Sequence, residues 1–388
     1  MEFRLTDEQL QVRDTVRRFA EREIAPRAEE LDRLGEFPYD LFHRAGELGI
    51  TALPFPKEVG GVGAGIVTFC LALEELARAD MSLAVTTMVS VGTGLILHQY
   101  GSETQKAKHL SRLVNGEGLG GIAGTEPNAG SDTQGFETTA REQNGAWILN
   151  GAKAFITNSG TKITDVILPV AVTGRKANGR KEFGMFVVPA GTPGFVVGPA
   201  YRKMGWRSSD THPLFFEDCR IPAENLLGSR GTGRWILHQG YAQARTFLAA
   251  TSIGLGQACL DASLKYAQER TAFGRPIGRF QMIQDMIAEM AVQLEAARLL
   301  MYKAAWLAEQ GQASLQATAT AKYYATEAAK RIADLAVQIH GGQGYMDECP
   351  VSRYYRDIRV ATIGDGSSQI QKLIIVRELG LGSGFTAG

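Results

Sequence analysis

The sequence predicts a mainly α-helical protein with a central β domain. Apolar residues recur at helical spacing over residues 1–118, short β-prone runs separated by turn-forming residues fill residues 119–231, and helical spacing returns over residues 232–388. A chain of 388 residues is long enough for two or three domains with a sizeable core. We therefore expect an N-terminal helical domain, a middle β domain and a C-terminal helical domain with these boundaries.

The N-terminal domain opens with a helix start. Thr6 precedes the acidic residues Asp7 and Glu8, an arrangement that caps a helix and complements its dipole. Further helices are expected over residues 39–48, 66–78, 82–99 and 103–115. The glycines of residues 60–65 form a flexible loop, because they do not fit the spacing of a dinucleotide-binding fingerprint and no strand precedes them.

The middle domain is divided by turn signals. Asn144-Gly145 and Asn150-Gly151 are typical of tight hairpins, and they flank the β-prone run 146–149. Residues 166–172, 185–188 and 214–216 look like further strands. Several short strands in a segment of this length predict a small barrel or sandwich.

The C-terminal domain is expected to consist of long helices. Residues 235–270, 280–310 and 313–340 carry almost no helix breaker, and Gly311 separates the last two stretches. Alanine is frequent in these stretches. Small residues on long helices favour close antiparallel packing, and such surfaces often continue into oligomer interfaces.

Composition argues against several classes of function. Lys plus Arg and Asp plus Glu each number 41, and a formal charge of zero argues against nucleic acid or an anionic membrane as the main partner. We find no apolar run of membrane-span length and no signal or transit peptide, which predicts a cytoplasmic protein. The four cysteines have no paired spacing and are read as reduced thiols, and the six histidines lack zinc-ligand spacing, so no metal site is expected.

The segment 364–369 places a carboxylate, Asp365, between two glycines just before a helical pattern resumes. Glycine permits a tight turn and the close approach of a ligand. Asp365 is therefore a candidate site residue. The alternative is a helix-capping loop with Ser367 or Ser368 as N-cap.

Two stretches of the middle domain have the residue types of a ligand site. In the segment 124–132, Thr125 and Ser131 bracket the turn formers Pro127, Asn128 and Gly130, and such a loop can present N–H groups and hydroxyls to a planar polar ligand. In the second stretch, Phe155 and Thr157 alternate along a strand and are expected to face one side. An ordinary turn and a strand with one buried face would give the same patterns.

Two helix ends carry further candidates. In Glu269-Arg270-Thr271-Ala272-Phe273-Gly274, Arg270 can neutralise a pyrophosphate. In Gln338-Ile339-His340-Gly341-Gly342-Gln343-Gly344-Tyr345, the glycines permit close approach of a ligand or form a helix C-cap.

These stretches, taken together and in this order, resemble the acyl-CoA dehydrogenase family across nearly the whole chain. The motifs that carry the resemblance are Gly124-Thr125-Glu126-Pro127-Asn128-Ala129-Gly130-Ser131-Asp132, Phe155-Ile156-Thr157-Asn158, the two helix ends above, and Asp365-Gly366-Ser367-Ser368-Gln369-Ile370-Gln371. The resemblance implies an N-terminal helical domain, a middle β-barrel and a C-terminal four-helix bundle. It also implies a homotetramer that binds FAD without a Rossmann fold.

The resemblance assigns roles by position. For the flavin and its surroundings it implies Ile122, Gly124, Thr125, Gly130, Ser131, Phe155, Ile156, Thr157, Ser367 and Gln369. For the FAD of a neighbouring subunit it implies Arg270, Phe273, Gln281, Gln338, Ile339, Gly341 and Gly342. For the substrate it implies Ser131, Ala242, Arg245, Gly366 and Arg377, with Arg245 near the CoA moiety.

The reaction implied is α,β-dehydrogenation of an acyl-CoA thioester. A carboxylate removes the α-proton while the β-hydrogen leaves as hydride to the flavin, and an electron-transfer flavoprotein is the usual electron acceptor. The α-proton is weakly acidic, so the enolate oxygen needs fixed donors, and the base needs a pKa raised by burial. Asp365 is the expected base.

The sequence departs from the family at this position, because most members carry glutamate where this chain has Asp365. The aspartate side chain is shorter by roughly 1.5 Å. Relatives that act on cyclic acyl-CoA substrates use aspartate, as do nitroalkane oxidases. Asp365 is thus the base of a dehydrogenase for a cyclic or α-branched acyl group, the base of an oxidase acting on a non-CoA carbon acid, or part of a non-catalytic flavoprotein. Arg245 favours the first of these.

The acyl pocket is expected to be neutral. The segment 81–97 resembles the helix that forms the pocket floor in the family, and it contains no acidic residue. Thr86, Thr87 and Met88 are expected to form that floor, which predicts against dicarboxylyl-CoA substrates.

Overall fold

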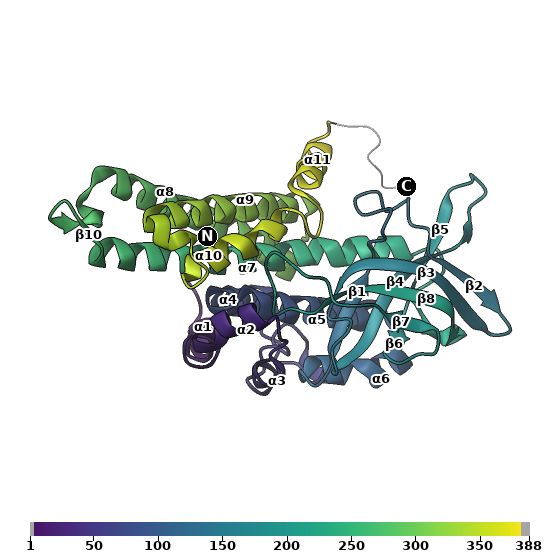
Figure 1. The fold of residues 1–388 in the computed structure, drawn as a ribbon. Helices are drawn as coiled ribbons and strands as arrows, with labels where there is room; N and C mark the ends of the chain where they lie inside the picture. Colours follow the sequence, from purple (N-terminus) through teal and green to yellow (C-terminus); the bar gives the residue numbers. More distant parts are fainter. Residues whose placement is uncertain (1–3, 382–388) are drawn as a thin grey trace.

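The computed structural model describes residues 4–381, in which helices, strands and again helices follow one another along the chain. Figure 1 shows a curled sheet at one end of the molecule, the long helix α7 running from the sheet to the opposite end, and the N-terminal helices packed along one side of α7. This arrangement confirms the predicted mainly helical fold with a central β domain.

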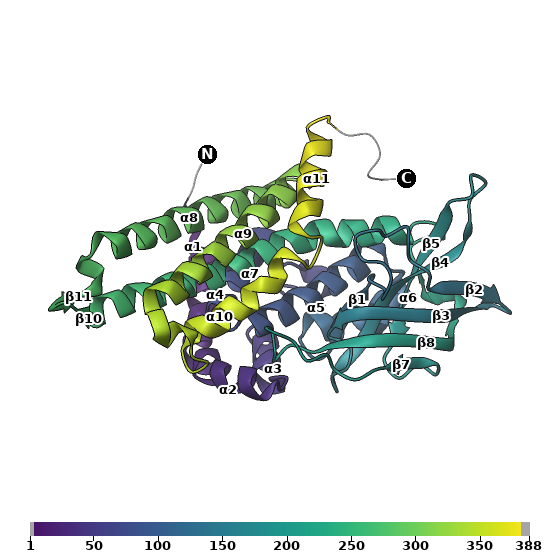
Figure 2. The same cartoon turned by 45° about the horizontal axis from the view of Figure 1, so that its top comes forward.

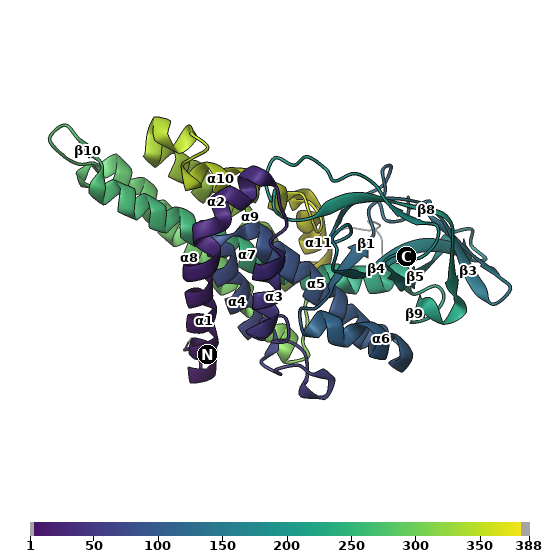
Figure 3. The same ribbon diagram turned by 60° about the horizontal axis from the view of Figure 1, so that its bottom comes forward.

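The N-terminal block is helical, and its first helix begins as predicted. The Thr6 hydroxyl accepts the backbone N–H of Gln9, and the Gln9 side chain accepts the N–H of Thr6, so that both satisfy groups that the helix start leaves unpaired. Figure 3 shows α5 (Met81–Tyr100) lying between α4 (Gly65–Ala79) and the sheet. The helices are α1 (Asp7–Phe19), α2 (Ala28–Leu34), α3 (Tyr39–Glu47), α4 (Gly65–Ala79), α5 (Met81–Tyr100) and α6 (Glu103–Val114).

The middle block forms one curled sheet in the described residues, with the strand order β7-β8-β3-β2-β4-β5-β9 and with β1 and β6 paired to β4. Strands β1 and β2 each run parallel to β4, and the other pairings in this sheet are antiparallel. The strands are β1 (Leu119–Ala123), β2 (Thr139–Gln143), β3 (Ala146–Thr157), β4 (Thr164–Arg175), β5 (Lys181–Phe186), β6 (Val188–Pro189), β7 (Phe195–Val197), β8 (Thr211–Pro222) and β9 (Leu226–Leu227).

One of the two predicted hairpin turns is correct and the other is wrong. Asn144 and Gly145 have φ values of 51° and 70° and join β2 to β3, as a tight hairpin requires. Asn150-Gly151 instead lies inside β3, where the register with β8 shifts and Gly151 has a φ of 142°. A Cβ at Gly151 would lie 2.7 Å from the Cα of Thr138, so the glycine serves close approach within the sheet instead of a turn.

The C-terminal block is a helical bundle whose long helices match the predicted stretches. Figure 2 shows α7, α8 and α9 side by side, with α10 against α9 and α11 projecting near the sheet. The elements are α7 (Gly233–Glu269), the hairpin β10 (Thr271–Ala272) and β11 (Arg275–Pro276), α8 (Gln281–Glu309), α9 (Leu315–His340), α10 (Pro350–Ile358) and α11 (Ser368–Glu378). A Cβ at Gly254 of α7 would lie 2.1 Å from the carbonyl oxygen of Glu74, so a small residue is needed where α7 crosses α4.

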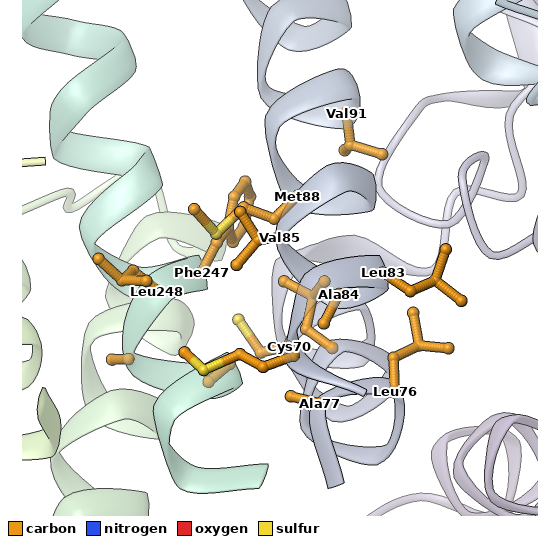
Figure 4. Close-up of a cluster of buried hydrophobic side chains, with 14 of the residues drawn as sticks. Cys70, Leu76, Ala77, Leu83, Ala84, Val85, Met88, Val91, Phe247 and Leu248 are labelled. Carbon is orange, nitrogen blue, oxygen red and sulfur yellow. The ribbon is translucent and has the colours of Figure 1, made fainter. Parts of the chain in front are cut away.

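The main core lies where α4, α5 and α7 meet. Figure 4 shows Val85 and Met88 of α5 beside Phe247 of α7. The rings of Phe69 and Phe247 pack edge to face with centroids 5.0 Å apart. Each fully buried side chain of this size contributes about 1.5–3 kcal/mol to stability. The core therefore fixes α5 against α7, and these two helices supply two walls of the site described below.

Two helices test the expectation that no apolar run reaches the length of a membrane span. By length and composition, α5 and α7 are each long and apolar enough to cross a membrane. In each helix, however, 78% of the apolar window is buried inside the structure, which is the behaviour of a core helix in a globular protein.

Candidate active site

A cavity of about 1270 Å³ lies where the sheet meets α5, α7 and the start of α11. Helix α5 lines it with Val85, Met88, Val89 and Gly92, all apolar. The expected neutral floor is therefore correct for Met88. Thr86 and Thr87 are buried outside the cavity wall, and the Thr87 hydroxyl donates to the carbonyl of Leu83 at 2.9 Å.

Asp365 lies in the cavity wall on a left-handed turn. Its φ is 52° and that of Gly366 is 89°. An L-residue in this region is strained unless neighbouring groups hold it. The Gln371 side-chain amide donates to the carbonyls of Asp365 (3.1 Å) and Gly366 (2.8 Å), and the Lys322 ammonium donates to the Gly366 carbonyl at 2.8 Å.

The capping interpretation of the segment 364–369 is confirmed, and the same segment also places Asp365 in the cavity wall. The Ser367 hydroxyl accepts the backbone N–H of Ile370 and caps α11, as the capping alternative predicts. Asp365 nevertheless lines the cavity, together with Gly366 and Ser367. The segment is thus a helix cap that presents a carboxylate to a ligand site.

The electrostatic surroundings of Asp365 suit a general base. Burial raises the pKa of the Asp365 carboxyl, although the cations of Lys322 and Arg245 oppose this shift. Arg245 is 4% exposed, lines the cavity, and has no hydrogen-bond partner for its Nε among the described residues. Burial lowers the pKa of Arg245 to about 10, against the opposing effect of Asp365. A carboxyl with a raised pKa beside a buried guanidinium is typical of a catalytic site.

The loop that follows β1 is held by a buried carboxylate. Glu126 accepts the backbone N–H groups of Glu137 (2.6 Å) and Thr138 (3.0 Å) and the Lys153 ammonium (2.8 Å). Lys153 also donates to the carbonyl of Gly124 at 3.0 Å. The predicted residues of this region that line the cavity are Ile122, Gly124, Thr125, Gly130 and Ser131.

The end of β3 forms a second part of the wall. Phe155 has a φ of 62° and is 65% exposed, and its ring lies 5.0 Å from that of Tyr201. The pairing with β8 shifts between Lys153 and Ile156. Because of this irregularity, the simple alternation expected from the sequence does not hold, and Phe155, Ile156 and Thr157 all line the cavity.

Cations predominate among the charged residues of the cavity wall. Asp132 and Asp365 are its only carboxylates in the described part of the chain, whereas nine basic side chains line it: Lys176, Lys181, Arg202, Lys203, Arg234, Arg245, Arg356, Arg359 and Arg377. Burial and the cations of Arg234, Arg245 and Arg377 lower the pKa of His238 to about 4, so this cavity-lining imidazole is neutral near pH 7. Such a wall favours an anionic ligand.

Several predicted residues lie away from this cavity. Ala242 of α7 and Gln369, which is exposed on α11, are not in its wall. The residues that were predicted to reach the FAD of a neighbouring subunit lie at the far end of the bundle, near the hairpin β10–β11 (Figure 1). They are Arg270, Phe273, Gln281, Gln338, Ile339, Gly341 and Gly342, and the Phe273 side chain is 95% exposed. The stacking of Tyr266 on His340 at 4.3 Å joins the two helix ends that carry these residues. Their roles toward a neighbouring subunit stay predictions.

Sequence reasoning missed several cavity or supporting residues. Tyr241 lies one helical turn before Arg245 and shares its face, so the spacing could have found it. Lys322 is a cation in an alanine-rich stretch of α9, which indicates a buried partner. Trp206 and Tyr201, on the loop before β8, carried no comparable signal.

The residues present fit the FAD that the resemblance implies. The exposed ring of Phe155 offers a flat apolar surface. The Trp206 Nε1 atom lies on a cavity-lining residue and, like Arg245 Nε, is buried without a hydrogen-bond partner in residues 4–381. Orphaned buried donors of this kind indicate a polar ligand. The cations suit a diphosphate.

Comparisons with known proteins agree with this geometry. Family models for the acyl-CoA dehydrogenase N-terminal, middle and C-terminal domains match residues 6–117, 121–219 and 231–380. The probable acyl-CoA dehydrogenase YngJ of Bacillus subtilis is 43% identical over 98% of this chain and 100% of its own length.

Two solved structures have the same fold. Butyryl-CoA dehydrogenase from Megasphaera elsdenii is 37% identical, with a TM-score of 0.95 over 98% of this chain and 100% of that one. A chain in a structure concerning the electron transferring flavoprotein of Acidaminococcus fermentans is 37% identical, with a TM-score of 0.94 over 98% of this chain and 99% of that one. The protein therefore belongs to the acyl-CoA dehydrogenase family and is an FAD-dependent oxidoreductase that dehydrogenates acyl-CoA.

Proposed function

We propose that Asp365 is the base that removes the α-proton of an acyl-CoA thioester. Bound FAD supplies the acceptor for the β-hydrogen, which leaves as hydride. The observation that carries the proposal is the position of Asp365 on a fixed turn in the wall of a predominantly cationic cavity. Burial raises the pKa of its carboxyl, as proton abstraction from a weak carbon acid requires.

The thioester oxygen needs a donor as negative charge develops on it. Among the backbone hydrogen bonds of residues 4–381, none has the N–H of Asp365 as its donor. This N–H belongs to the same residue as the base, and the turn fixes its direction relative to the carboxylate. We infer that it donates to the enolate oxygen while the carboxylate takes the α-proton.

The cationic side of the cavity suits the phosphates of CoA and FAD. Arg245 and Arg377 line the wall with Asp365, and Ser131 and Gly366 line it as well. His238 stays neutral near pH 7, and the hydroxyl of Thr133 lies 3.2 Å from its Nε2, so it acts as a hydrogen-bonding group and not as a charge. We also propose that Ala242 contacts the substrate and that Gln369 contacts FAD.

The acyl group is proposed to be cyclic or α-branched. Aspartate at position 365 reaches roughly 1.5 Å less far than the usual glutamate, so the α-carbon has to lie closer to the turn. The α5 side of the cavity consists of Val85, Met88, Val89 and Gly92. This wall offers no cation for a second carboxylate, which argues against dicarboxylyl-CoA substrates.

The assembly is proposed to be a cytoplasmic homotetramer that passes electrons to an electron-transfer flavoprotein. We propose that each chain has three domains, at residues 1–118, 119–231 and 232–388. In this assembly, the cluster at the β10–β11 end reaches the FAD of a neighbouring subunit. Support comes from exposed apolar side chains along α8, namely Met282, Val292, Leu299 and Trp306, which are 81%, 69%, 44% and 52% exposed in the single chain.

The test is anaerobic mixing of the FAD-loaded protein with a panel of linear, α-branched and cyclic acyl-CoAs. Bleaching of the flavin absorbance by branched or cyclic members supports the proposal, and a preference for linear chains contradicts the substrate class. Bleaching by nitroalkanes alone, with peroxide formation in air, identifies an oxidase of a non-CoA carbon acid. No bleaching by any compound identifies a non-catalytic homologue.

A further inference from the structure

Lys322 lies in α9 with its side chain fully buried. Its neighbours along the helix include Ala319, Ala321 and Ala325, which are also buried. The ammonium group donates to the Gly366 carbonyl at 2.8 Å, which is the only hydrogen bond of this group in the described part of the chain. A buried lysine destabilises the fold unless its charge is compensated. Lys322 therefore needs a negative charge nearby in addition to one carbonyl.

Among the nearby carboxylates, that of Asp365 does most to oppose the lowering of the Lys322 pKa by burial. Asp365 precedes Gly366, and both residues have left-handed φ values. The Gly366 carbonyl accepts one hydrogen bond from Lys322 of α9 and one from Gln371 of α11, both fully buried side chains. Gln371 also donates to the Asp365 carbonyl at 3.1 Å, so side chains from α9 and α11 together hold the turn that carries the carboxylate.

Three helices supply charged and titratable groups to Asp365 and its neighbours. Helix α7 contributes Arg245 and Tyr241, α9 contributes Lys322 and Glu327, and α11 carries Arg377. Burial lowers the pKa of Lys322 to about 8, with Asp365 and Glu327 opposing the shift and Arg245 adding to it. Lys322 is therefore still protonated near pH 7.

We propose that Lys322 is a positioning residue for the base: its ammonium fixes the Asp365–Gly366 turn and provides the counter-charge that keeps the carboxylate ionised when substrate closes the site. The proposal rests on the proposed role of Asp365. It assigns to α9 a function in the chemistry although, in this chain, no described residue of α9 beyond Leu315 lines the cavity.

The experiment compares Lys322→Met and Lys322→Gln with the wild type. Flavin reduction by the best acyl-CoA of the panel is followed by anaerobic stopped flow from pH 5 to pH 10. Loss of the positive charge raises the pKa of Asp365. The pH range in which the reduction rate rises should therefore move about one unit to the alkaline side in both variants, and reduction at pH values below that range should be about tenfold slower. Lys322→Gln retains a donor and should keep more of the limiting rate at high pH.

The proposal is overturned if both variants lose the same fraction of the reduction rate at every pH and the pH at which the rate rises does not move. A lysine with a merely structural role would have that effect. Lys108→Met serves as the matched control, since Lys108 is exposed on α6. It should leave the limb and the rate unchanged.

A second readout needs no substrate and separates this inference from the proposed function. Thermal unfolding of the FAD-loaded protein is compared for wild type, Lys322→Met, Asp365→Asn and the double variant between pH 5 and pH 7. The pKa of Asp365 is raised in the folded protein, so its ionisation costs stability as pH rises. The loss caused by Lys322→Met should therefore grow with pH, and in the Asp365→Asn background this growth should vanish. Equal, pH-independent losses in both backgrounds would refute the counter-charge even if every acyl-CoA failed to reduce the flavin.

Discussion

Glu126 and Lys153 form a buried ion pair, with the Lys153 ammonium 2.8 Å from Glu126 Oε1, and this pair ties the loop after β1 to β3. The two side chains are 5% and 0% exposed. Burial raises the pKa of the Glu126 carboxyl, but Lys153 and the N–H groups of Glu137 and Thr138 outweigh burial, so its pKa is lowered overall. The pair anchors the loop that contains Thr125, and neither of its two side chains lines the cavity.

Replacing Glu126 by Gln should destabilise the protein by about 3–5 kcal/mol, because it leaves the buried Lys153 ammonium without a counter-ion. Lys153→Met should cost less, since the carboxylate keeps the two backbone donors of Glu137 and Thr138. Chemical denaturation measures both. In the double variant the losses should be clearly smaller than additive, and additive losses would show that the pair is not coupled.

Gly366→Ala should reduce both stability and flavin reduction. Gly366 has a φ of 89°, and a Cβ there would lie 2.6 Å from the Gln371 Nε2 atom that holds the turn. We expect a loss of about 1–3 kcal/mol and a clear fall in the reduction rate. Gly364→Ala is the matched control, because its Cβ would lie 3.7 Å from its nearest neighbour, the Val360 carbonyl. Equal behaviour of the two variants in unfolding and stopped-flow measurements would contradict the proposed rigidity of the turn.

Asp365→Asn should slow flavin reduction by about 10²–10⁴-fold while FAD stays bound, because the amide cannot accept the α-proton. Asp365→Glu should also be slower with branched or cyclic acyl-CoAs, since the longer side chain enters a pocket built for aspartate and is less tolerant of a φ of 52°. Anaerobic stopped flow measures both rates, and the flavin spectrum checks cofactor content. Wild-type reduction rates in Asp365→Asn would show that another group is the base.

Asp357→Asn should change the pH dependence of stability. Asp357 Oδ1 accepts the backbone N–H of Trp206 at 2.7 Å. Burial, reinforced by the charge of Asp80, raises the pKa of Asp357 to about 7. A raised folded-state pKa gives stability that is present at low pH and is lost as pH rises through about 7. The asparagine variant keeps the acceptor but cannot ionise.

The free energy of unfolding of Asp357→Asn, relative to that of wild type, should therefore rise between pH 5 and pH 8.5 by an amount on the order of 2–4 kcal/mol. Thermal unfolding across this range measures the difference. Asp285→Asn, at an exposed position on α8, is the control and should show a constant difference. A constant difference for Asp357→Asn as well would mean that Asp357 is already ionised at pH 5.

Local patterns in the sequence were sufficient for the helix–sheet–helix order, for the Thr6 cap and for the turn at Asp365. These features depend on periodicity and on residues within one or two turns of each other, and such information is present in a short stretch of sequence. The same reasoning failed at Asn150-Gly151, where a strong turn signal lies inside β3 because Thr138 of a neighbouring segment approaches the glycine.

The sequence by itself determined the class of protein and the carboxylate that is proposed to act, whereas the tertiary structure decided what surrounds that carboxylate. Lys322 reaches the Gly366 carbonyl across 44 residues, and Trp206 donates to Asp357 across 151. Burial, and with it the raised pKa of Asp365, depends on helices that meet only in the folded chain. The physical reason is that desolvation and charge–charge energies are set by distance in space, which spacing along the chain does not encode.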